Sequence, residues 1–308
     1  MPWSPRVADG VAPTAIEIDL AWLSANPLPR PGEDTDKNSR GHVVAIGGSR
    51  QVPGGLLLTA EAALRAGAGK VQLATVASCA LGIGIAIPEA GVLALGETED
   101  GEIDAAGIAP LRENLERCDC VIVGPAMSSA DRACELLDAM LRGLLERQSL
   151  VLDAVALHAA RGREQALCAH RGALILTPNP DELASLLGCD EARIADDPAG
   201  CARTAAQRLG AVMVCKGSET FVADPEGALL RYPGGGVGLA TGGSGDVLAG
   251  IVAALLARGA EPLTAAAWSV WLHGEAGRQL AGSVGPIGFL ARELPPLIPG
   301  LLEDPISI

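Results

Sequence analysis

The amino-acid sequence predicts an α/β protein in which a mostly parallel central sheet carries helices on both faces and an antiparallel hairpin at one edge. Short apolar segments rich in β-branched residues alternate with longer segments of helical periodicity, which is the pattern of parallel strands linked by helices. Late in the chain, two short strands flank the turn sequence Asp-Pro-Glu-Gly at 224–227, which is typical of a hairpin. With 308 residues, of which 49% are hydrophobic, the chain has ample apolar material for a core.

The first half of the chain alternates strand and helix. Residues 42–48 form a β-branched run that ends in glycines, and residues 56–69 follow with helical periodicity and a glycine stop. Residues 70–76 predict the next strand, and residues 120–127 predict a buried strand that runs into a Gly-Pro turn. The remaining elements expected in this part are two strands that end in polar or turn residues, at 149–157 and 173–179, and helices at 131–147, 180–188 and 200–209.

The second half begins with three expected strands and ends in helices. The strands are expected at 211–217, 220–227 and 228–233, and after a glycine-rich loop the helices are expected at 244–258, 262–280 and 288–298. Residues 1–36 are rich in proline and polar side chains, and they predict an N-terminal extension with one amphipathic piece at 16–26. Residues 37–308 show no linker and no internal repeat, so we expect them to form a single domain.

Charge and composition exclude several classes of partner. The formal net charge is −14, from 23 Lys and Arg against 37 Asp and Glu, whereas nucleic acids and anionic membranes need a basic face. No apolar run reaches the ~20 residues of a membrane span, and the N-terminus has no signal-peptide pattern. The eight cysteines include no C-x-x-C pair, which favours reduced cysteines in a cytoplasmic protein and argues against zinc.

Polar and glycine residues follow six of the predicted strands. In open α/β sheets, ligands bind beyond the carboxyl ends of the strands, so these residues outline a cleft along one edge. The segments concerned are 47–49, 124–126, Asp153, 177–179, 216–218 and 234–246.

The strongest motif is the glycine-rich loop that enters the helix expected from residue 244. Residues 234–245 hold seven glycines in twelve positions, and Gly242, Gly243, Ser244 and Gly245 immediately precede Asp246. The first N–H groups of a helix have no internal partner, so such a loop can cradle a phosphate. Asp246 would then lie within reach of the bound group as a general base. The alternative interpretation is a capped helix whose aspartate only complements the helix dipole.

Three other positions carry charged or titratable side chains that could take part in binding or catalysis. Lys216 leaves a strand at the head of the sequence Lys-Gly-Ser-Glu-Thr, where it can neutralise phosphate charge, or it belongs to an ordinary exposed turn. Asp153 directly follows an apolar strand and, as an unpaired carboxylate, would face solvent, a metal or a ligand, unless it caps the next helix. His273, on an apolar helix, fits a hydrogen-bonded structural histidine better than a catalytic base.

The order of these motifs resembles that of the ADP/ATP-dependent NAD(P)H-hydrate dehydratases, which belong to the ribokinase-like superfamily. The matching pieces run from GHVVAIGGS at 41–49 to WLHGEAG at 271–277, and they include LILTPNPDELASLLG and GLATGGSGDVLAGIVAALLARG. They extend over nearly the whole chain after residue 36. The 36 residues before them are too few for the epimerase domain that some members carry, so the resemblance implies a stand-alone dehydratase.

The resemblance implies a function and a set of site residues. The family uses ADP or ATP, with Mg²⁺ held mainly by the nucleotide phosphates, to eliminate water from hydrated NADH or NADPH and restore the reduced cofactor. Asp246 would be the catalytic base, and residues 242–245 would cradle the phosphate. Nucleotide contacts would come from Lys216, Gly217, Ser218, Glu219, Thr220 and Gly245. Substrate contacts would come from Gly55, Ala126, Asn179 and Asp246. Family members often form tetramers, so we expect a homo-oligomer.

Four departures from the family pattern fall on the substrate half of the site. Ala126 ends a Gly-Pro-Ala where Gly-Pro-Gly is usual, and Asn179 ends a Thr-Pro-Asn where Thr-Pro-His is usual. Val155 replaces a small residue, and Gly55 stands where alanine is common. The sequence supports phosphoryl chemistry more firmly than it supports the identity of the substrate. The alternatives are a small-molecule kinase of the same superfamily, for a vitamin precursor or a sugar, and a non-catalytic nucleotide-binding protein. The choices between ADP and ATP, and between NADH and NADPH hydrate, stay open.

Overall fold

The computed structural model describes residues 14–30, 32, 35–142, 145 and 147–303. Within these ranges a ten-stranded sheet has the order β1-β10-β9-β8-β7-β6-β5-β2-β3-β4. The strands are β1 (Ile16–Glu17), β2 (His42–Ile46), β3 (Lys70–Val76), β4 (Gly91–Leu95), β5 (Cys120–Val123), β6 (Ser149–Leu152), β7 (Leu174–Leu176), β8 (Val212–Cys215), β9 (Thr220–Ala223) and β10 (Leu229–Tyr232). The seven strands from β8 to β4 pair in parallel, whereas β9 is antiparallel to both β8 and β10.

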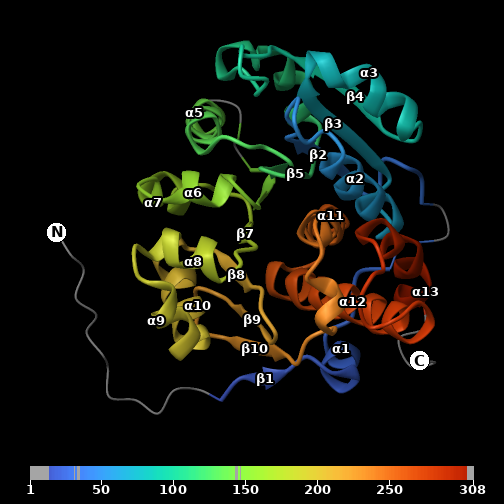
Figure 1. Ribbon diagram of the computed structural model, residues 1–308, viewed down its shortest axis with the longest axis vertical. Helices are drawn as coiled ribbons and strands as arrows, with labels where there is room; N and C mark the ends of the chain where they lie inside the picture. The colour runs from blue at the N-terminus through green and yellow to red at the C-terminus, as the bar shows by residue number, and fades with distance from the viewer. Residues whose placement is uncertain (1–13, 31, 33–34, 143–144, 146, 304–308) are drawn as a thin grey trace.

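Helices cover both faces of this sheet (Figure 1). The helices are α1 (Leu20–Ala25), α2 (Gly55–Arg65), α3 (Ala77–Ala86), α4 (Arg112–Glu116), α5 (Ala130–Leu141), α6 (Ala156–Ala160), α7 (Glu164–Cys168), α8 (Pro180–Leu187), α9 (Glu191–Asp196), α10 (Pro198–Leu209), α11 (Ser244–Ala257), α12 (Pro262–Ser283) and α13 (Ile298–Glu303). In Figure 1, α5 to α10 lie on the left of the sheet, and α2, α11, α12 and α13 lie on the right. The predicted α/β class, with its mostly parallel sheet and antiparallel hairpin, is confirmed.

The strands divide their side chains between two hydrophobic cores. On β5, Cys120 and Ile122 pack with the core under α2, α11 and α12, while Val121 and Val123 pack with the core under α5, α8 and α10. This division follows from the two-residue period of a strand, which sends successive side chains to opposite faces. Both faces of the central strands are therefore buried, which explains their continuous apolar runs.

Helix α11 is buried on nearly all sides and lies against α2. A Cβ atom built on Gly250 would lie 2.3 Å from the carbonyl oxygen of Thr59, so only glycine lets the two backbones approach this closely. This contact packs α2 against the middle of α11, so the helix that follows the glycine-rich loop is set close to α2.

Several parts of the structure differ from the sequence predictions. The short helices α4, α6, α7 and α9 were not expected, and the strand expected at 149–157 ends at Leu152. The helix expected at 288–298 is wrong, because the chain there forms two 3₁₀ turns, Ala291–Glu293 and Pro295–Leu297, before α13 begins. Pro295 and Pro296 supply no N–H groups, and they interrupt a regular helix. Helix α3 and strand β4 were not predicted, because α3 is apolar on all sides and lacks the periodic signal of a surface helix.

The segment predicted as an N-terminal extension contacts the domain where the structure describes it. Strand β1 pairs in parallel with β10, so the hairpin of β9 and β10 is not at the edge of the sheet as predicted. Ile18 and Leu23 are buried in the core, and Trp268 donates a hydrogen bond to the carbonyl oxygen of Asn26 at 2.8 Å. The division at residues 36 and 37 stays a prediction.

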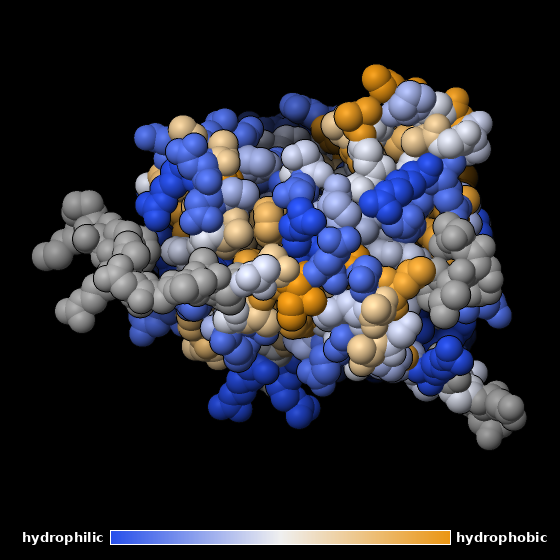
Figure 2. All heavy atoms as spheres, turned by 90° about the horizontal axis from the view of Figure 1, so that it is seen from below, coloured by the Kyte–Doolittle hydropathy of each residue, from blue (hydrophilic) through white to orange (hydrophobic). Residues whose placement is uncertain are grey.

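One face of the molecule is mostly polar. The face shown in Figure 2 is largely hydrophilic, and its hydrophobic residues lie in small groups between charged and polar ones. Among the described residues, no helix combines the length and the apolar character needed to cross a membrane.

Candidate active site

The glycine-rich loop meets α11 at the carboxyl end of the sheet, as the sequence predicted. Gly243 is the N-cap of α11 with a φ of +88°, a conformation that favours glycine, and no side chain caps the helix. The N–H groups of Gly245 and Asp246 make no backbone hydrogen bond within the described chain. The first turn of α11 therefore presents free donors at the positive end of the helix dipole, which suits an anion.

Asp246 lies in this first turn, beside residues that come from two other loops. A Cβ atom built on Gly55 would lie 2.9 Å from Asp246 Oδ2 and 2.8 Å from the Cβ of Ala126. The structure thus brings together three of the residues predicted for the substrate side. The absence of a side chain at Gly55 lets the carboxylate of Asp246 and the methyl group of Ala126 approach its backbone closely. Ala126 adopts a positive φ of 57° in the turn after β5.

Burial changes the acidity of Asp246. The pKa of this carboxyl is raised from 3.8 to about 7, chiefly by desolvation and also by the negative charge of Asp153, while the ammonium of Lys216 opposes both effects. A carboxylate with a pKa near 7 can accept a proton from a hydroxyl and release it again at physiological pH. Such a perturbed carboxyl next to a phosphate cradle is typical of a catalytic group.

Lys216 anchors a network of buried polar groups behind the cradle. Its Nζ donates to Asp153 Oδ1 at 3.1 Å and lies 3.8 Å from Glu182 Oε2. Thr177 Oγ1 donates to Asp153 Oδ1 at 2.6 Å. These carboxylates raise the pKa of Lys216 despite its desolvation, so the ammonium stays charged. A Cβ atom built on Gly245 would lie 3.3 Å from Lys216 Nζ, which places this charge against the first turn of α11.

The expectation that Asp153 is unpaired is wrong, and so is its exposure to solvent. Its side chain is only 2% exposed, and it is occupied by Lys216 and Thr177. It does not cap the next helix either, since α6 begins at Ala156 without a side-chain cap. The sequence could not reveal this pairing, because Lys216 is 63 residues away. Asp153 therefore positions Lys216, and a direct contact between Asp153 and a ligand stays a prediction.

Asn179 caps helix α8, a structural role that the sequence analysis did not predict. Its Oδ1 accepts a hydrogen bond from the N–H of Glu182 at 2.8 Å, and Glu182 Oε2 accepts one from the N–H of Asn179 at 2.7 Å. These two bonds form a capping box at the start of α8. The signal was present in the sequence, as Asn-Pro-Asp-Glu ahead of an apolar run. A contact between Asn179 and the substrate stays a prediction.

The remaining nucleotide candidates lie on the turn between β8 and β9. Residues 217–219 form this turn and Thr220 begins β9. Glu219 is paired with Arg231 at 2.6 Å, so its side chain is directed toward β10. The backbone of Gly217 and Ser218 is the part of this turn that remains for a ligand.

His273 is a hydrogen-bonded structural histidine, as the sequence predicted, but its partner belongs to the cradle. Its Nε2 lies 2.9 Å from Ser244 Oγ and 3.0 Å from the carbonyl oxygen of Ser244. Desolvation lowers the pKa of His273 to about 4, so the ring is neutral near pH 7. The side chain therefore ties α12 to the first residue of α11.

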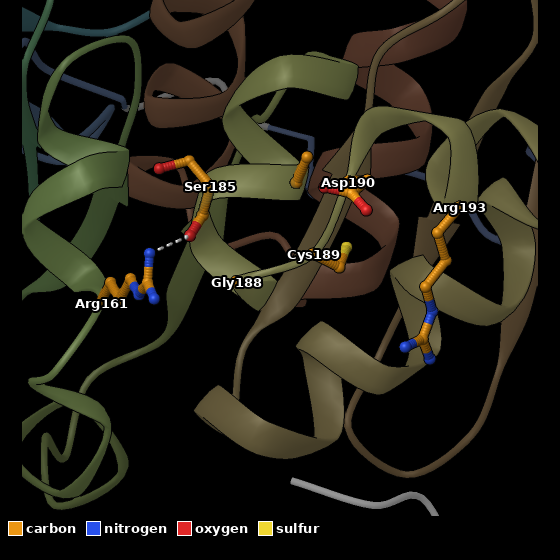
Figure 3. A pocket seen from close by; sticks show the side chains of 7 residues that line it. Arg161, Ser185, Gly188, Cys189, Asp190 and Arg193 are labelled. Carbon is orange, nitrogen blue, oxygen red and sulfur yellow. Dashed lines mark hydrogen bonds between the residues drawn. The ribbon is translucent and has the colours of Figure 1, made fainter. Parts of the chain in front are cut away.

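A groove of about 950 Å³ opens beside the cradle. Its lining includes Gly54, Thr241 and Gly242, and it continues along α2 toward Arg65. A second cavity, of about 470 Å³, lies at the far end of α8 from Asn179 and is shown in Figure 3. There Arg161 donates to the carbonyl oxygen of Ser185 in the last turn of α8, which is a helix-capping contact. The groove, and not this second cavity, belongs to the site around Asp246.

No group of three or more His, Cys, Asp or Glu side chains in the described ranges is placed to hold a metal ion. The carboxylate of Asp246 lies beside the cradle, with Oδ2 3.8 Å from a Cβ atom built on Gly243. A hard cation such as Mg²⁺ prefers carboxylate and phosphate oxygens. The residues present therefore suit a cation that arrives with a phosphate ligand.

Comparison with known proteins identifies a family that matches this chain. The model of the family described as NAD(P)H-hydrate dehydratase matches residues 43–299. A protein of Xanthomonas campestris, named ADP-dependent (S)-NAD(P)H-hydrate dehydratase, is 45% identical over 94% of this chain and 97% of its own length. The Bifunctional NAD(P)H-hydrate repair enzyme Nnr of Moorella thermoacetica is 36% identical over 93% of the chain, which spans only 54% of that enzyme.

A solved structure has the same fold over almost the whole chain. The ADP/ATP-dependent NAD(P)H-hydrate dehydratase of Bacillus subtilis, co-crystallised with ATP and Mg²⁺, superposes with a TM-score of 0.80 at 25% identity. The superposition covers 94% of this chain and 98% of that one. On the breadth of the family match and the identity to its members, the chain belongs to the NAD(P)H-hydrate dehydratase family.

Proposed function

We propose that this chain restores NADH or NADPH from its hydrate, in a reaction that consumes ADP or ATP. The observation that carries the proposal is the carboxyl of Asp246, whose pKa is raised to about 7 in the first turn of a helix with free N–H donors. Membership of the NAD(P)H-hydrate dehydratase family supplies the substrate class. The Xanthomonas relative is named for ADP, and on that ground ADP is our first choice of co-substrate.

The chemistry proceeds in two steps that balance. Asp246 takes the proton of the hydrate's hydroxyl, and the oxygen attacks the terminal phosphorus of the nucleotide. The bond between that phosphorus and its bridging oxygen breaks, so that ADP leaves as AMP. In the second step the carbon–oxygen bond of the phosphorylated hydrate breaks, phosphate leaves, and a proton from the neighbouring carbon is lost as the double bond forms. The sum is hydrate plus ADP to reduced cofactor, AMP, phosphate and one proton, which Asp246 releases to solvent.

The chain's own residues stabilise the charge that moves in the first step. The N–H groups of Gly245 and Asp246 point to the place where the transferred phosphate would lie, and donors fixed before the reaction need no reorganisation. Lys216, kept charged by Asp153 and Glu182, adds a cation at the same end of α11. Mg²⁺ held mainly by the nucleotide phosphates would neutralise further phosphate charge.

The proposal assigns the two ligands to opposite sides of Asp246. The co-substrate lies toward Lys216 and the turn of residues 217–220. The hydrated ring lies toward Gly55 and Ala126, the two small residues in close contact beside the carboxylate of Asp246. Asn179 stays a candidate for a contact through its amide group. A homo-oligomer, for which a tetramer is the first expectation, and a cytoplasmic location are further parts of the proposal.

The test is recovery of the near-ultraviolet absorbance of reduced nicotinamide from purified hydrate, ADP and Mg²⁺. Wild-type protein should restore the absorbance and form AMP in equal amount. Asp246→Asn should keep its nucleotide affinity and lose turnover by about 10²–10⁴, the usual contribution of a positioned acid–base group. A protein that consumes nucleotide and accumulates a stable phosphorylated product, without restoring absorbance, would instead be a kinase.

A further inference from the structure

The groove along α2 has no role in the chemistry described so far, although it opens directly beside the cradle. Thr241 and Gly242 line its inner end, together with Gly54 from the start of α2. Leu58 and Ala291, which also line the groove, are the side chains closest to a Cβ atom built on Gly243, at 2.3 Å and 3.4 Å. The wall of the groove and the wall of the cradle are therefore the same residues.

The direction of the groove leads away from Lys216. From Gly54 it follows α2 to Arg65, eleven residues further on, which is about 16 Å at the rise of an α-helix. The opposite wall comes from the turn of residues 86–89 and from residues 290–292. The volume of about 950 Å³ lies within the usual range for sites that hold small organic ligands.

Apolar and charged side chains line the groove together. Leu57, Leu58, Leu64 and Ile87 give it an apolar floor. Arg65 lies 3.7 Å from Glu61 in an exposed pair, and Glu89 is exposed at the rim. Arg292 is exposed near the inner end of the groove, and no ion pair is recorded for it among the described residues. A cation next to an apolar floor suits a ligand that joins a phosphate to a flat ring.

The proposed substrate needs a second binding site for the half of the molecule that does not react. A hydrated dinucleotide has its reacting ring at Asp246, and its second half, an adenosine monophosphate, must leave the centre in some direction. The side toward Lys216 belongs to the co-substrate in the proposed function. The route past Gly54, Thr241 and Gly242 leads into the groove.

We infer that the groove along α2 binds the adenosine-monophosphate half of the hydrated dinucleotide, with Arg292 contacting its phosphate. This inference rests on the proposed function, and it adds the residues that hold the part of the substrate that does not react. Remote binding of this kind can be used to orient the reacting ring. The groove then selects a dinucleotide over a mononucleotide, although the chemistry at Asp246 is the same for both.

The experiment compares two substrates: NADH hydrate and the hydrate of reduced nicotinamide mononucleotide, which lacks the adenosine-monophosphate half. In Arg292→Ala, the KM for NADH hydrate should rise about tenfold, the usual effect of losing one charge-assisted hydrogen bond, while kcat/KM for the mononucleotide hydrate stays at the wild-type value. Arg292→Lys should recover part of the loss. Ala86→Trp, at an exposed lining position, should narrow the groove and raise the same KM.

The control is Arg171→Ala, an exposed arginine that precedes β7 at the opposite end of the sheet, and it should change neither KM. Equal losses on both substrates in Arg292→Ala would overturn the inference, and so would a raised KM for ADP alone, which would put the co-substrate in the groove. If the wild type converts neither hydrate to the reduced cofactor, the proposed function fails. The affinities of NADH and reduced nicotinamide mononucleotide, measured by calorimetry, then test the groove separately. An unchanged NADH affinity in Arg292→Ala overturns the inference.

Discussion

At the scale of single residues, the raised pKa of Asp246 predicts how activity depends on pH. The base must be ionised to accept the hydroxyl proton, and its pKa in the free protein is about 7. We expect kcat/KM to rise with pH and to level off above about pH 7. A profile measured with NADH hydrate between pH 5 and 9 tests this, and a profile already flat at pH 5 would contradict the assignment.

The same pKa has a consequence for stability. The folded protein binds the Asp246 proton more tightly than the unfolded chain, in which this carboxyl has a pKa near 3.8. The protonated carboxyl therefore contributes its full share of the free energy of unfolding below about pH 4, and this contribution is lost as pH rises through about 7. Asp246→Asn removes this dependence. The variant should exceed the wild type in free energy of unfolding by about 1–3 kcal/mol at pH 8, with no gain at pH 4, in denaturant titrations.

The two small residues beside Asp246 depend on each other. Alanine is common in the family at position 55 and glycine at position 126, whereas this chain has the reverse. A methyl group on Gly55 would lie 2.8 Å from the methyl group of Ala126, so both cannot be present without movement. We expect Gly55→Ala to lower kcat/KM more than tenfold, and Ala126→Gly combined with it to restore most of the activity. Equal activity of the single and double variants would exclude this coupling.

At the scale of elements, the capping box of α8 complicates any test of Asn179. Asn179→Ala removes the helix cap and the amide together, so it should lower the free energy of unfolding by about 1 kcal/mol as well as weaken hydrate binding by about 1–2 kcal/mol. Asn179→Ser keeps an oxygen for the cap and loses the amide. If the amide contacts the substrate, Asn179→Ser should unfold like the wild type and still have a raised KM for the hydrate.

Elements with a strong local signal were the ones that the sequence predicted well. The strands at 42–46, 70–76 and 120–123 are buried on both faces and therefore read as apolar runs, and α11 follows a glycine-rich stop. The helix expected at 288–298 failed at its prolines, and the pairing of Asp153 with Lys216 depends on tertiary contacts between distant segments. The cradle could be read from residue order, but the groove could not, because its walls come from segments more than 200 residues apart.

At the scale of the whole molecule, the N-terminal segment completes the sheet rather than preceding it. Strand β1 pairs with β10, Ile18 and Leu23 are buried, and Asn26 accepts a hydrogen bond from Trp268. Removal of residues 1–30 should therefore lower the melting temperature by several degrees, since burial of two aliphatic side chains contributes about 3–5 kcal/mol. Removal of residues 1–13 alone serves as the matched control. An unchanged melting temperature in the longer deletion would show that this contact contributes nothing.

Positions 55 and 126 together have room for only one methyl group. This limit also constrains the order in which the two residues can be substituted. Consider a chain with alanine at position 55 and glycine at position 126. It reaches the present pair, Gly55 and Ala126, through one of two intermediates. The one with two alanines has no room for both methyl groups beside the carboxylate of Asp246, whereas the one with two glycines leaves only an unfilled space. The path without a clash therefore loses the first methyl group before it gains the second.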